Sequence, residues 1–463
     1  MTRSFLLAGM ISMLATGAGA VGPTYHAPVE APVVLAAPQL PALTRETPQG
    51  RWWSAFQDPE LDALIGRALA ANLDVRQAVA RVDQARALFK DSQLDQFPRI
   101  TSHASYSRSD EQVPGFGAGR VQIEQADLGF DAAWEIDLFG RVRHQVEAAR
   151  AEADAARADL EDVRVSIAAE VARNYLELRG ANARRVVAEE NAAAARETLR
   201  LTRLRLDVGY GDPVDVQSAQ ASLKATEALI PPLVAQQMQA GYRLAVLLGQ
   251  RPGALDQELA ALAPQPLRAT AIPVGDVSGF LRRRPDVRVA ERRLAAETAR
   301  TGVATADLFP RVRVTGFIGL LSGNVSDLFR KDSQAWAVSP TVSWPAFDLG
   351  GARARLRAQR AKGEESLAAY QQTALRAIED LNDSVAAYGQ RQAQTARLAE
   401  QADAARKAAD LARIRYREGG IDFLRVLDAD RSRLQAEDAL TQAQTASNTD
   451  VVAIYKALGG GWG

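Results

Sequence analysis

A long internal repeat constrains the fold of this chain more than any other feature of its sequence. Leu73–Val75 corresponds to Pro285–Val287, and Phe97–Arg99 corresponds to Phe309–Arg311. Both pairs have the same offset along the chain (287 − 75 and 309 − 97). This offset is far longer than the period of a solenoid repeat, which is about 20–50 residues. The sequence therefore predicts a duplicated structural unit whose two copies form one body.

Each half contains two segments that alternate in the manner of a β-strand. In the first half they are 99–109 and 126–138, and in the second half 311–318 and 335–348. The apolar positions of each returning strand share one face, which in a barrel would meet lipid while the polar face lines water. Four strands cannot close a membrane barrel, because the smallest barrels have about 8 strands and unpaired edges are costly in lipid. We therefore expect the chain to oligomerise. Three tryptophans near strand ends suit the aromatic girdle of a membrane interface: Trp134, Trp336 and Trp344.

Each half also contains a very long helical segment, over about 141–208 and 352–418, with the 3-4 apolar spacing of a coiled coil. Both segments end at turns of similar sequence, at 205–220 and 415–430. A shorter helix then returns over 214–248 or 423–458. A further helix is expected over 60–95, because Asp58-Pro59 is a favourable N-cap and first-turn pair.

Composition excludes several functional classes. Lys+Arg and Asp+Glu number 56 each, so no basic field indicates nucleic acid. Cysteine is absent, and the three histidines, His26, His103 and His144, are too scattered to predict a metal site. The glycine-rich stretch 115–119 lacks the helix that follows a phosphate-binding loop, which favours a hairpin tip. No catalytic motif is present, so we expect neither an enzyme nor a cofactor.

The N-terminus has the pattern of a secretion signal. Arg3 supplies the positive charge, 5–14 supply the apolar core, and 18–20 supply small residues for cleavage, which places the mature start near Val21. The alternative, a membrane anchor, is disfavoured because the apolar run is shorter than the roughly 20 residues that a span needs.

These features together resemble the TolC-like outer-membrane efflux channels, in particular the OprM-type branch that serves resistance-nodulation-division (RND) pumps. The resemblance covers the mature chain in order: VGPTY at 21–25, WWSAFQDPELDALIGRAL at 52–69, WEIDLFGRVR at 134–143, LRRRPDVRVAERRL at 281–294, LFPRVRVTGF at 308–317 and WPAFDLG at 344–350. It implies an α+β membrane protein in the outer membrane, extending into the periplasm. A homotrimer would contribute four strands per chain to a 12-stranded β-barrel, continued by an α-helical coiled-coil tunnel.

The resemblance also implies the partners and the site. The partners would be a periplasmic adaptor, an inner-membrane RND pump and outer-membrane lipids. Leu424 and Asp428, with Arg425 in place of a second aspartate, would form a periplasmic gate; the alternative is an ordinary solvated helix surface. A hydrogen bond between Tyr416 and Asp215 would hold the gate closed, whereas the alternative for Tyr416 is packing in the helix seam. The adaptor would contact the two turns at the helix ends, although their glycines also suit helix C-caps: Gly209, Gly211, Asp212, Gly419, Gly420 and Asp422.

One departure concerns the anchor, since Gly19 stands where this branch usually has a lipid-bearing cysteine. The expected organisation is a signal peptide (1–20), an extended arm (21–58), a first repeat (59–248, hairpin 99–138), a connector (249–277), a second repeat (278–458, hairpin 311–348) and a tail (459–463). We expect a passive efflux duct for drugs or other small toxic compounds. A secretion channel for proteins or peptides, or a metal-ion efflux channel, stays open as an alternative. A poreless coiled-coil stalk is disfavoured because it has no use for apolar strands in both halves.

Overall fold

The computed structural model describes residues 20–28, 43–44, 50–112, 119–260, 272–273 and 279–460. The expected signal segment with Gly19, most of the glycine-rich loop 115–119 and the end of the expected tail lie outside these residues. The chain divides into two compact units. Unit 1 comprises residues up to 29, 80–158 and 288–372, and unit 2 comprises 30–79, 159–287 and 373–463.

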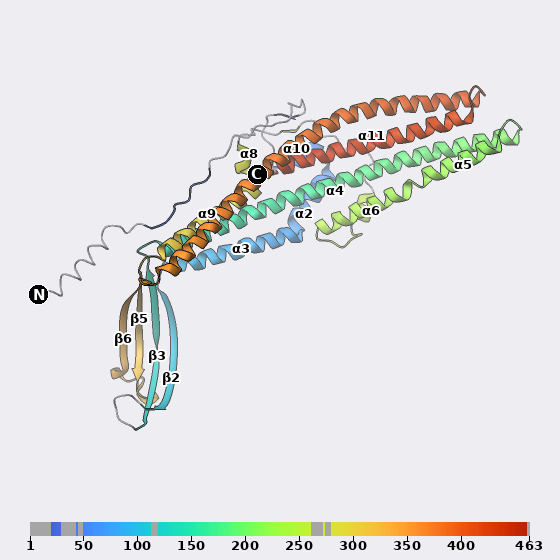
Figure 1. The fold of residues 1–463 in the computed structure, drawn as a ribbon. Coiled ribbons are helices and arrows are strands. Elements are labelled where there is room, and N and C mark those ends of the chain that lie inside the picture. Colours follow the sequence, from blue (N-terminus) through green and yellow to red (C-terminus); the bar gives the residue numbers. More distant parts are fainter. Residues whose placement is uncertain are drawn as a thin grey trace. The chain divides into compact units, whose positions relative to one another are not determined.

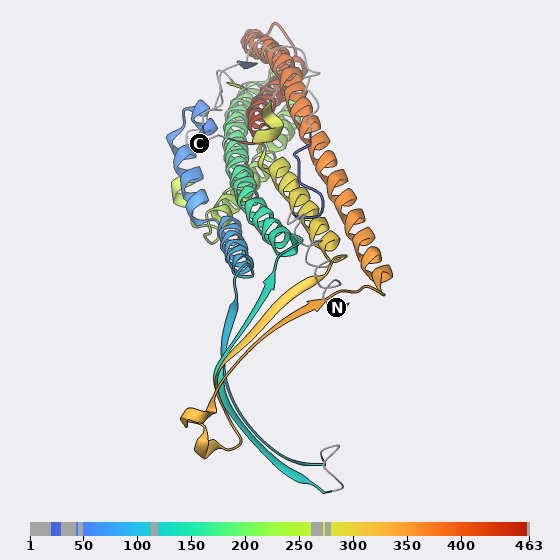
Figure 2. The same cartoon turned by 90° about the vertical axis from the view of Figure 1, so that its left-hand side faces the viewer.

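Unit 1 contains a four-stranded antiparallel sheet (Figures 1 and 2). Its strands are β2 (Arg99–Glu111), β3 (Val121–Ile136), β5 (Arg311–Ser322) and β6 (Gln334–Ser343), in the order β2-β3-β5-β6. β3 pairs with β5 from Ala126↔Ser322 to Ile136↔Val312, which joins the two halves of the sequence in one sheet. β6 ends at Ser343, earlier than the predicted strand over 335–348. The short helices η3 (Val325–Asp327) and η4 (Lys331–Ser333) lie between β5 and β6.

The helices that precede the strands confirm the register of the repeat. α3 (Leu73–Leu94) and α9 (Pro285–Ala306) both have 22 residues, and their first residues have the same offset as the motifs (285 − 73). The prediction of one helix over 60–95 is wrong, because α2 (Pro59–Ala71) ends at Ala71 and the backbone of the next residue, Asn72, is extended. The Asn72 side chain accepts from the N–H groups of Asp74 and Val75 at 2.8 and 3.1 Å. Asn72 thus caps a new helix.

The two predicted long helices are present as α4 (Arg141–Asp207) and α10 (Leu349–Arg417). α11 (Phe423–Ala457) returns from α10 as one helix, but the return from α4 is divided into α5 (Pro213–Glu227) and α6 (Ile230–Leu247). The prediction of a single helix over 214–248 is therefore wrong. Pro231 and Pro232 supply no backbone N–H, so a helix can begin there but not run through them. Within the described ranges, no helix is both long and apolar enough to cross a membrane.

Unit 2 also contains short elements that the sequence did not predict. In the arm, β1 (Leu43–Thr44) pairs in parallel with β4 (Ile272–Pro273), a contact that the expectation of an extended arm did not include. The helices η1 (Trp52–Phe56), α7 (Asp256–Ala260) and α8 (Phe280–Arg283) complete the described elements. The Trp52 ring stacks on Tyr455 at a centroid distance of 5.0 Å, which fixes η1 to the last turns of α11.

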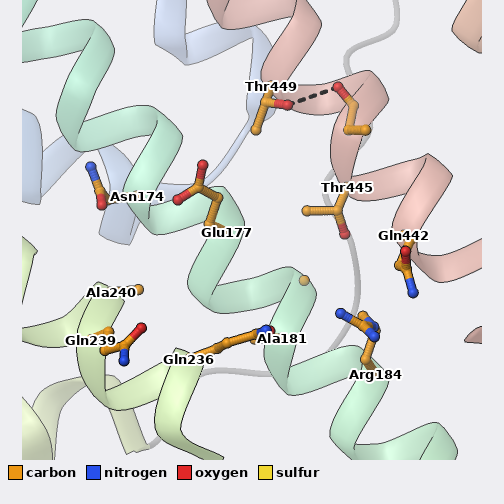
Figure 3. Close-up of a pocket in the computed structure, with 12 residues that line it drawn as sticks. Asn174, Glu177, Ala181, Arg184, Gln236, Gln239, Ala240, Gln442, Thr445 and Thr449 are labelled. Carbon is orange, nitrogen blue, oxygen red and sulfur yellow. Dashed lines mark hydrogen bonds between the residues drawn. The ribbon is translucent and has the colours of Figure 1, made fainter. Parts of the chain in front are cut away.

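Two features of unit 2 depend on single residues. A Cβ at Gly180 would lie 2.4 Å from Thr445 Oγ1, so only glycine permits α4 and α11 to approach this closely. Beside this contact, α4, α6 and α11 line a polar cleft of about 590 Å³ that includes Gln236, Gln239 and Gln442 (Figure 3).

The buried Arg284, just before α9, is the second of these features. It donates to both oxygens of Asp286 at 3.0 and 2.7 Å and to Asp380 at 3.0 Å. It also donates to the carbonyl oxygens of Ala377 and Ala457 at 3.3 and 2.9 Å. Arg284 therefore links α9, α10 and the end of α11.

In unit 1, the segment 20–28 is held by main-chain and side-chain contacts. The Val21 N–H donates to the Phe139 carbonyl at 3.0 Å, and the Val21 carbonyl lies 3.1 Å from His144 Nε2. The Tyr25 hydroxyl donates to Glu291 on α9. The start of the expected mature chain is thus fastened to α4 and α9.

Candidate functional site

The ends of α4 and α10 have the same backbone turn. Gly209 and Gly419 adopt left-handed φ angles of 80° and 76°. The next N–H groups, of Tyr210 and Gly420, donate to the carbonyls of Arg205 and Arg415, both at 2.8 Å. This is the glycine-terminated helix end that satisfies otherwise unpaired carbonyls. The C-cap explanation therefore holds for Gly209 and Gly419, and contact with an adaptor stays a prediction.

The residues after each turn start the returning helix. Asp212 accepts from the Val214 N–H at 2.8 Å, and Asp422 accepts from the Arg425 N–H at 3.0 Å. Both aspartates are therefore helix N-caps. A Cβ at Gly211 would lie 2.6 Å from the Leu206 nitrogen, so this turn closes too tightly for a side chain.

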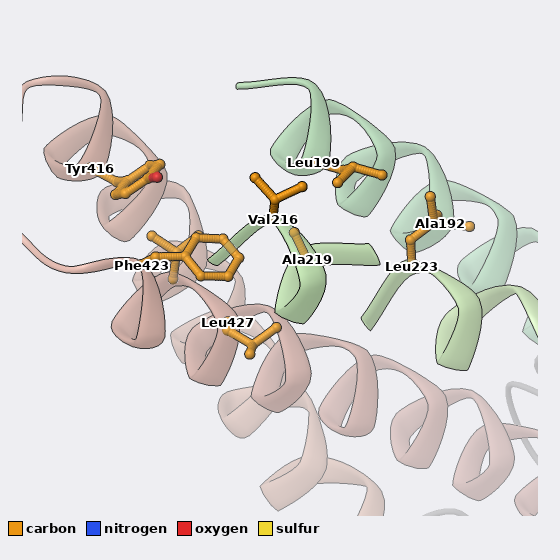
Figure 4. Packing of buried hydrophobic residues seen from close by; sticks show 9 residues of the cluster. Ala192, Leu199, Val216, Ala219, Leu223, Tyr416, Phe423 and Leu427 are labelled. Carbon is orange, nitrogen blue, oxygen red and sulfur yellow. The ribbon is translucent and has the colours of Figure 1, made fainter. Parts of the chain in front are cut away.

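Beneath the turns, an apolar cluster joins four helices (Figure 4). Its buried members come from α4, α5, α10 and α11, and partly buried apolar residues pack around them. The turns therefore belong to one packed body within unit 2. The buried members are Ala192, Leu199, Val216, Ala219, Leu223, Tyr416, Phe423, Val426 and Leu427.

The three predicted gate residues lie on one exposed face of α11. Leu424 is 62% exposed, and Arg425 and Asp428 are also exposed. Phe423 and Val426, by contrast, belong to the cluster. Leu424 and Asp428 are four residues apart, one helical turn, so they share this face. Among the described residues, no ion pair joins Arg425 to Asp428.

Tyr416 contacts an arginine that the sequence analysis did not single out. The Arg205 guanidinium carbon lies 4.6 Å from the centre of the Tyr416 ring, and Arg205 Nη1 donates to the Tyr416 carbonyl at 3.0 Å. The Phe423 ring lies 5.8 Å away from the Tyr416 ring. Packing of Tyr416 in the seam, the alternative interpretation, is therefore observed.

The predicted hydrogen bond between Tyr416 and Asp215 is not formed within the described part of this single chain. Burial and the nearby Asp212 raise the pKa of Asp215, while Arg205 acts in the opposite direction. The positive charge of Arg205 therefore acts on the Asp215 carboxyl group. Arg205 stands shortly before the first turn, as Arg415 does before the second, but the sequence does not show which arginine meets the tyrosine.

The sheet has two chemically distinct faces. Phe130, Ile318 and Trp336 are exposed on the apolar face, at 57, 65 and 78%. Trp134 and Trp344 donate their indole N–H groups at 3.0 Å to the carbonyls of Gln96 and Leu308. These two acceptors precede β2 and β5, so Trp134 and Trp344 lie at the end of the sheet nearest the helices.

Metal-binding side chains do not gather in the described ranges: no group of three or more His, Cys, Asp or Glu residues there could hold a metal ion.

The two-faced strands and the paired long helices define a class of protein, a channel that enters a membrane with strands and continues with helices. The sequence pattern of the family described as "Outer membrane efflux protein" matches residues 64–250 and 277–460. The chain belongs to this family.

Individual relatives agree with this assignment. The chain is 30% identical to the outer membrane protein OprJ of Pseudomonas aeruginosa over 99% of this chain and 96% of that protein. It is 32% identical to the antibiotic efflux pump outer membrane protein ArpC of Pseudomonas putida, over 100% of this chain and 96% of that protein. The solved structure of the outer-membrane channel OprN is similar with a TM-score of 0.92 and 46% identity, over 96% of this chain and 99% of that chain.

These similarities confirm the predicted fold class and location. The protein is an outer-membrane efflux channel, a trimer in which each chain contributes four strands to the barrel and long helices to the tunnel. The polar face of the sheet accordingly lines the lumen and the apolar face meets lipid. The family is one of transport proteins.

Proposed function

We propose that this channel is the exit duct of a tripartite RND-type pump and that its cargo consists of small toxic organic compounds. Two relatives support the cargo class: ArpC is named for antibiotic efflux, and the 32% identical TtgC of Pseudomonas putida is named for toluene efflux. The channel itself supplies no energy, so an inner-membrane pump and a periplasmic adaptor must deliver the cargo.

The observation that carries this proposal is the pair of matching turns at the ends of α4 and α10. Tyr210 is 80% exposed beside Gly209, and Val208 and Val214 flank it as further exposed apolar residues. Rigid turns that present exposed apolar side chains suit a protein partner. The two turns, with the glycines and capping aspartates named above, form the proposed adaptor contact.

The exposed face of Leu424, Arg425 and Asp428 is the proposed periplasmic gate. In a trimer, three copies of this face would surround the tunnel axis, with Leu424 narrowing it and Asp428 favouring cations. Arg205 joins Tyr416 and Asp215 in the contact that holds the gate closed, since its guanidinium packs on the tyrosine ring and its positive charge acts on Asp215. Trp134 and Trp344 are proposed for one interfacial girdle and Trp336 for the other.

The test is crosslinking of the full-length protein in its native membrane. A photoreactive amino acid replaces Tyr210, and a matched variant carries it at Leu88, an exposed apolar residue of α3. We expect the Tyr210 variant to capture an adaptor and to co-purify an RND pump, and the Leu88 variant to capture neither. Equal capture at both positions, or capture of a secreted protein without any pump, would contradict the proposal.

A further inference from the structure

A charged cluster on the lumen face of the sheet belongs to unit 1, whereas the proposed gate residues belong to unit 2. His103 Nε2 is 2.7 Å from Asp127 Oδ2, and His103 Nδ1 is 2.5 Å from Asp131 Oδ2. The Ser105 hydroxyl donates to Asp127 Oδ1 at 2.6 Å. Asp127 and Asp131 alternate along β3 with the apolar Leu128 and Phe130, so the whole cluster faces the lumen.

The position of the imidazole follows from two glycines in neighbouring strands. Gly129 is the cross-strand partner of both His103 and Gly319. A Cβ at Gly129 would lie 2.5 Å from Phe317 Cε2, so the Phe317 ring occupies the space above the glycine pair. The ring centres of Phe317 and His103 are 5.8 Å apart. Phe317 therefore helps to hold the imidazole against the wall between the two carboxylates.

The cluster has a net negative charge in either protonation state of the histidine. Two carboxylates face one imidazole, which carries one positive charge at most. The next carboxylate along this face, Glu135, is already paired with Arg141, with an N–O distance of 2.6 Å. Arg313, the cross-strand partner of Glu135, adds a positive charge at that level of the wall. The negative charge of this section therefore lies at Asp127 and Asp131.

We infer that Asp127 and Asp131, balanced in part by His103, set a preference for cations in the strand-lined section of the pore. Three copies surround the lumen of the trimer, and rings of acidic side chains make a pore cation-selective. The effect is separate from that of Asp428, which belongs to α11 of unit 2. Cationic organic compounds would accordingly leave through this section more readily than anionic ones.

Ionic strength separates this contribution from that of a narrow gate. Charges on the wall of a wide lumen reach its centre when the Debye length is about 30 Å, at 0.01 M salt, and not when it is about 3 Å, at 1 M. A constriction brings its charges close to the permeating ion, so its preference persists at high salt. The wall contribution should therefore be visible only at low salt.

The experiment measures reversal potentials of the intact trimer in planar bilayers under KCl gradients around 0.01 M and 1 M. D127N/D131N should lower the cation-to-anion permeability ratio by about twofold or more at low salt and leave it unchanged at 1 M. His103→Gln, which keeps both carboxylates, should maintain or raise the ratio. Glu124→Gln is the matched control, because Glu124 lies on the opposite face of β3 and pairs with Arg108.

The milder variant Asp131→Asn keeps the contact between Ser105 and Asp127 and serves if the double variant does not assemble. The inference would be overturned if an assembled aspartate variant had the wild-type cation-to-anion permeability ratio at low salt. It would also be overturned if Glu124→Gln lowered this ratio as much as the aspartate variant does. A fall of similar size at both salt concentrations would also overturn it, because it would indicate that the substitutions act on a constriction.

Discussion

The contact between Arg205 and Tyr416 gives the most direct test of the proposed gate. The distance of 4.6 Å from guanidinium to ring centre is within the range of cation–π attraction, about 0.5–2 kcal/mol. The bond from Arg205 to the Tyr416 carbonyl adds about 1 kcal/mol. Removing both should destabilise the closed state by about 2 kcal/mol per chain, which shifts the opening equilibrium roughly 30-fold.

The substitution Arg205→Met retains most of the side-chain length and removes the charge. We expect single trimers in planar bilayers to open more often and to show a higher mean conductance. Tyr416→Phe keeps the ring under Arg205 and deletes only the hydroxyl, so it should change conductance less than Arg205→Met does. Arg203→Met is the matched control, because Arg203 is an exposed arginine of α4 that contacts Gln220.

Two results would refute this reasoning. Wild-type conductance in Arg205→Met would show that the contact does not hold the gate. A large increase in conductance in Tyr416→Phe alone would show that the tyrosine hydroxyl holds the gate closed, through a bond with Asp215 that forms in the assembled trimer.

Two further predictions concern unit 2. Arg284→Met should destabilise the trimer by about 3–5 kcal/mol, because Asp286 and two buried carbonyls lose their donor. Thermal unfolding in detergent measures this loss. The control is Arg397→Met, which removes an exposed pair with Glu400 and should cost about 1 kcal/mol at most. Burial, reinforced by the charge of Asp286, raises the pKa of Asp162 to about 6. Since this is above the unfolded value of about 3.9, the contribution of Asp162 to stability is fully present below pH 3.9 and is lost as the pH rises through about 6. Above pH 6, the free energy of unfolding of Asp162→Asn should therefore exceed that of the wild type by at most about 3 kcal/mol. Parallel pH profiles of the thermal midpoint for the two proteins would contradict the raised pKa of Asp162.

The sequence predicted those parts of the fold that depend on local pattern. The constant offset between the two halves located the starts of α3 and α9, and it also relates Arg99 to Arg311 at the starts of β2 and β5. The break at Asn72 was missed because asparagine is compatible with a helix, and its role as a cap depends on the backbone around it. The division between α5 and α6 was missed although Pro231-Pro232 was a signal for it.

The contacts between segments that are distant in the sequence could not be predicted from the sequence. The pairing of His103 with Asp127 and Asp131 depends on the register of β2 against β3, which alternation alone does not fix. The three histidines are scattered along the chain, so their spacing gives no signal for this cluster. Similarly, the contact of Arg205 with Tyr416 depends on how two helix ends pack, although the two side chains belong to different halves of the sequence.

The strand order has a consequence for biogenesis. β3 pairs with β5, and the partners Ala126 and Ser322 belong to different halves of the chain. At a synthesis rate of about 5–20 residues per second, β5 appears roughly 10–40 s after β3. Throughout that interval the hairpin of β2 and β3 exposes an unpaired edge and an apolar face, the conditions under which strands aggregate. From the order of the strands we therefore expect a chaperone to protect this first hairpin until β5 is available.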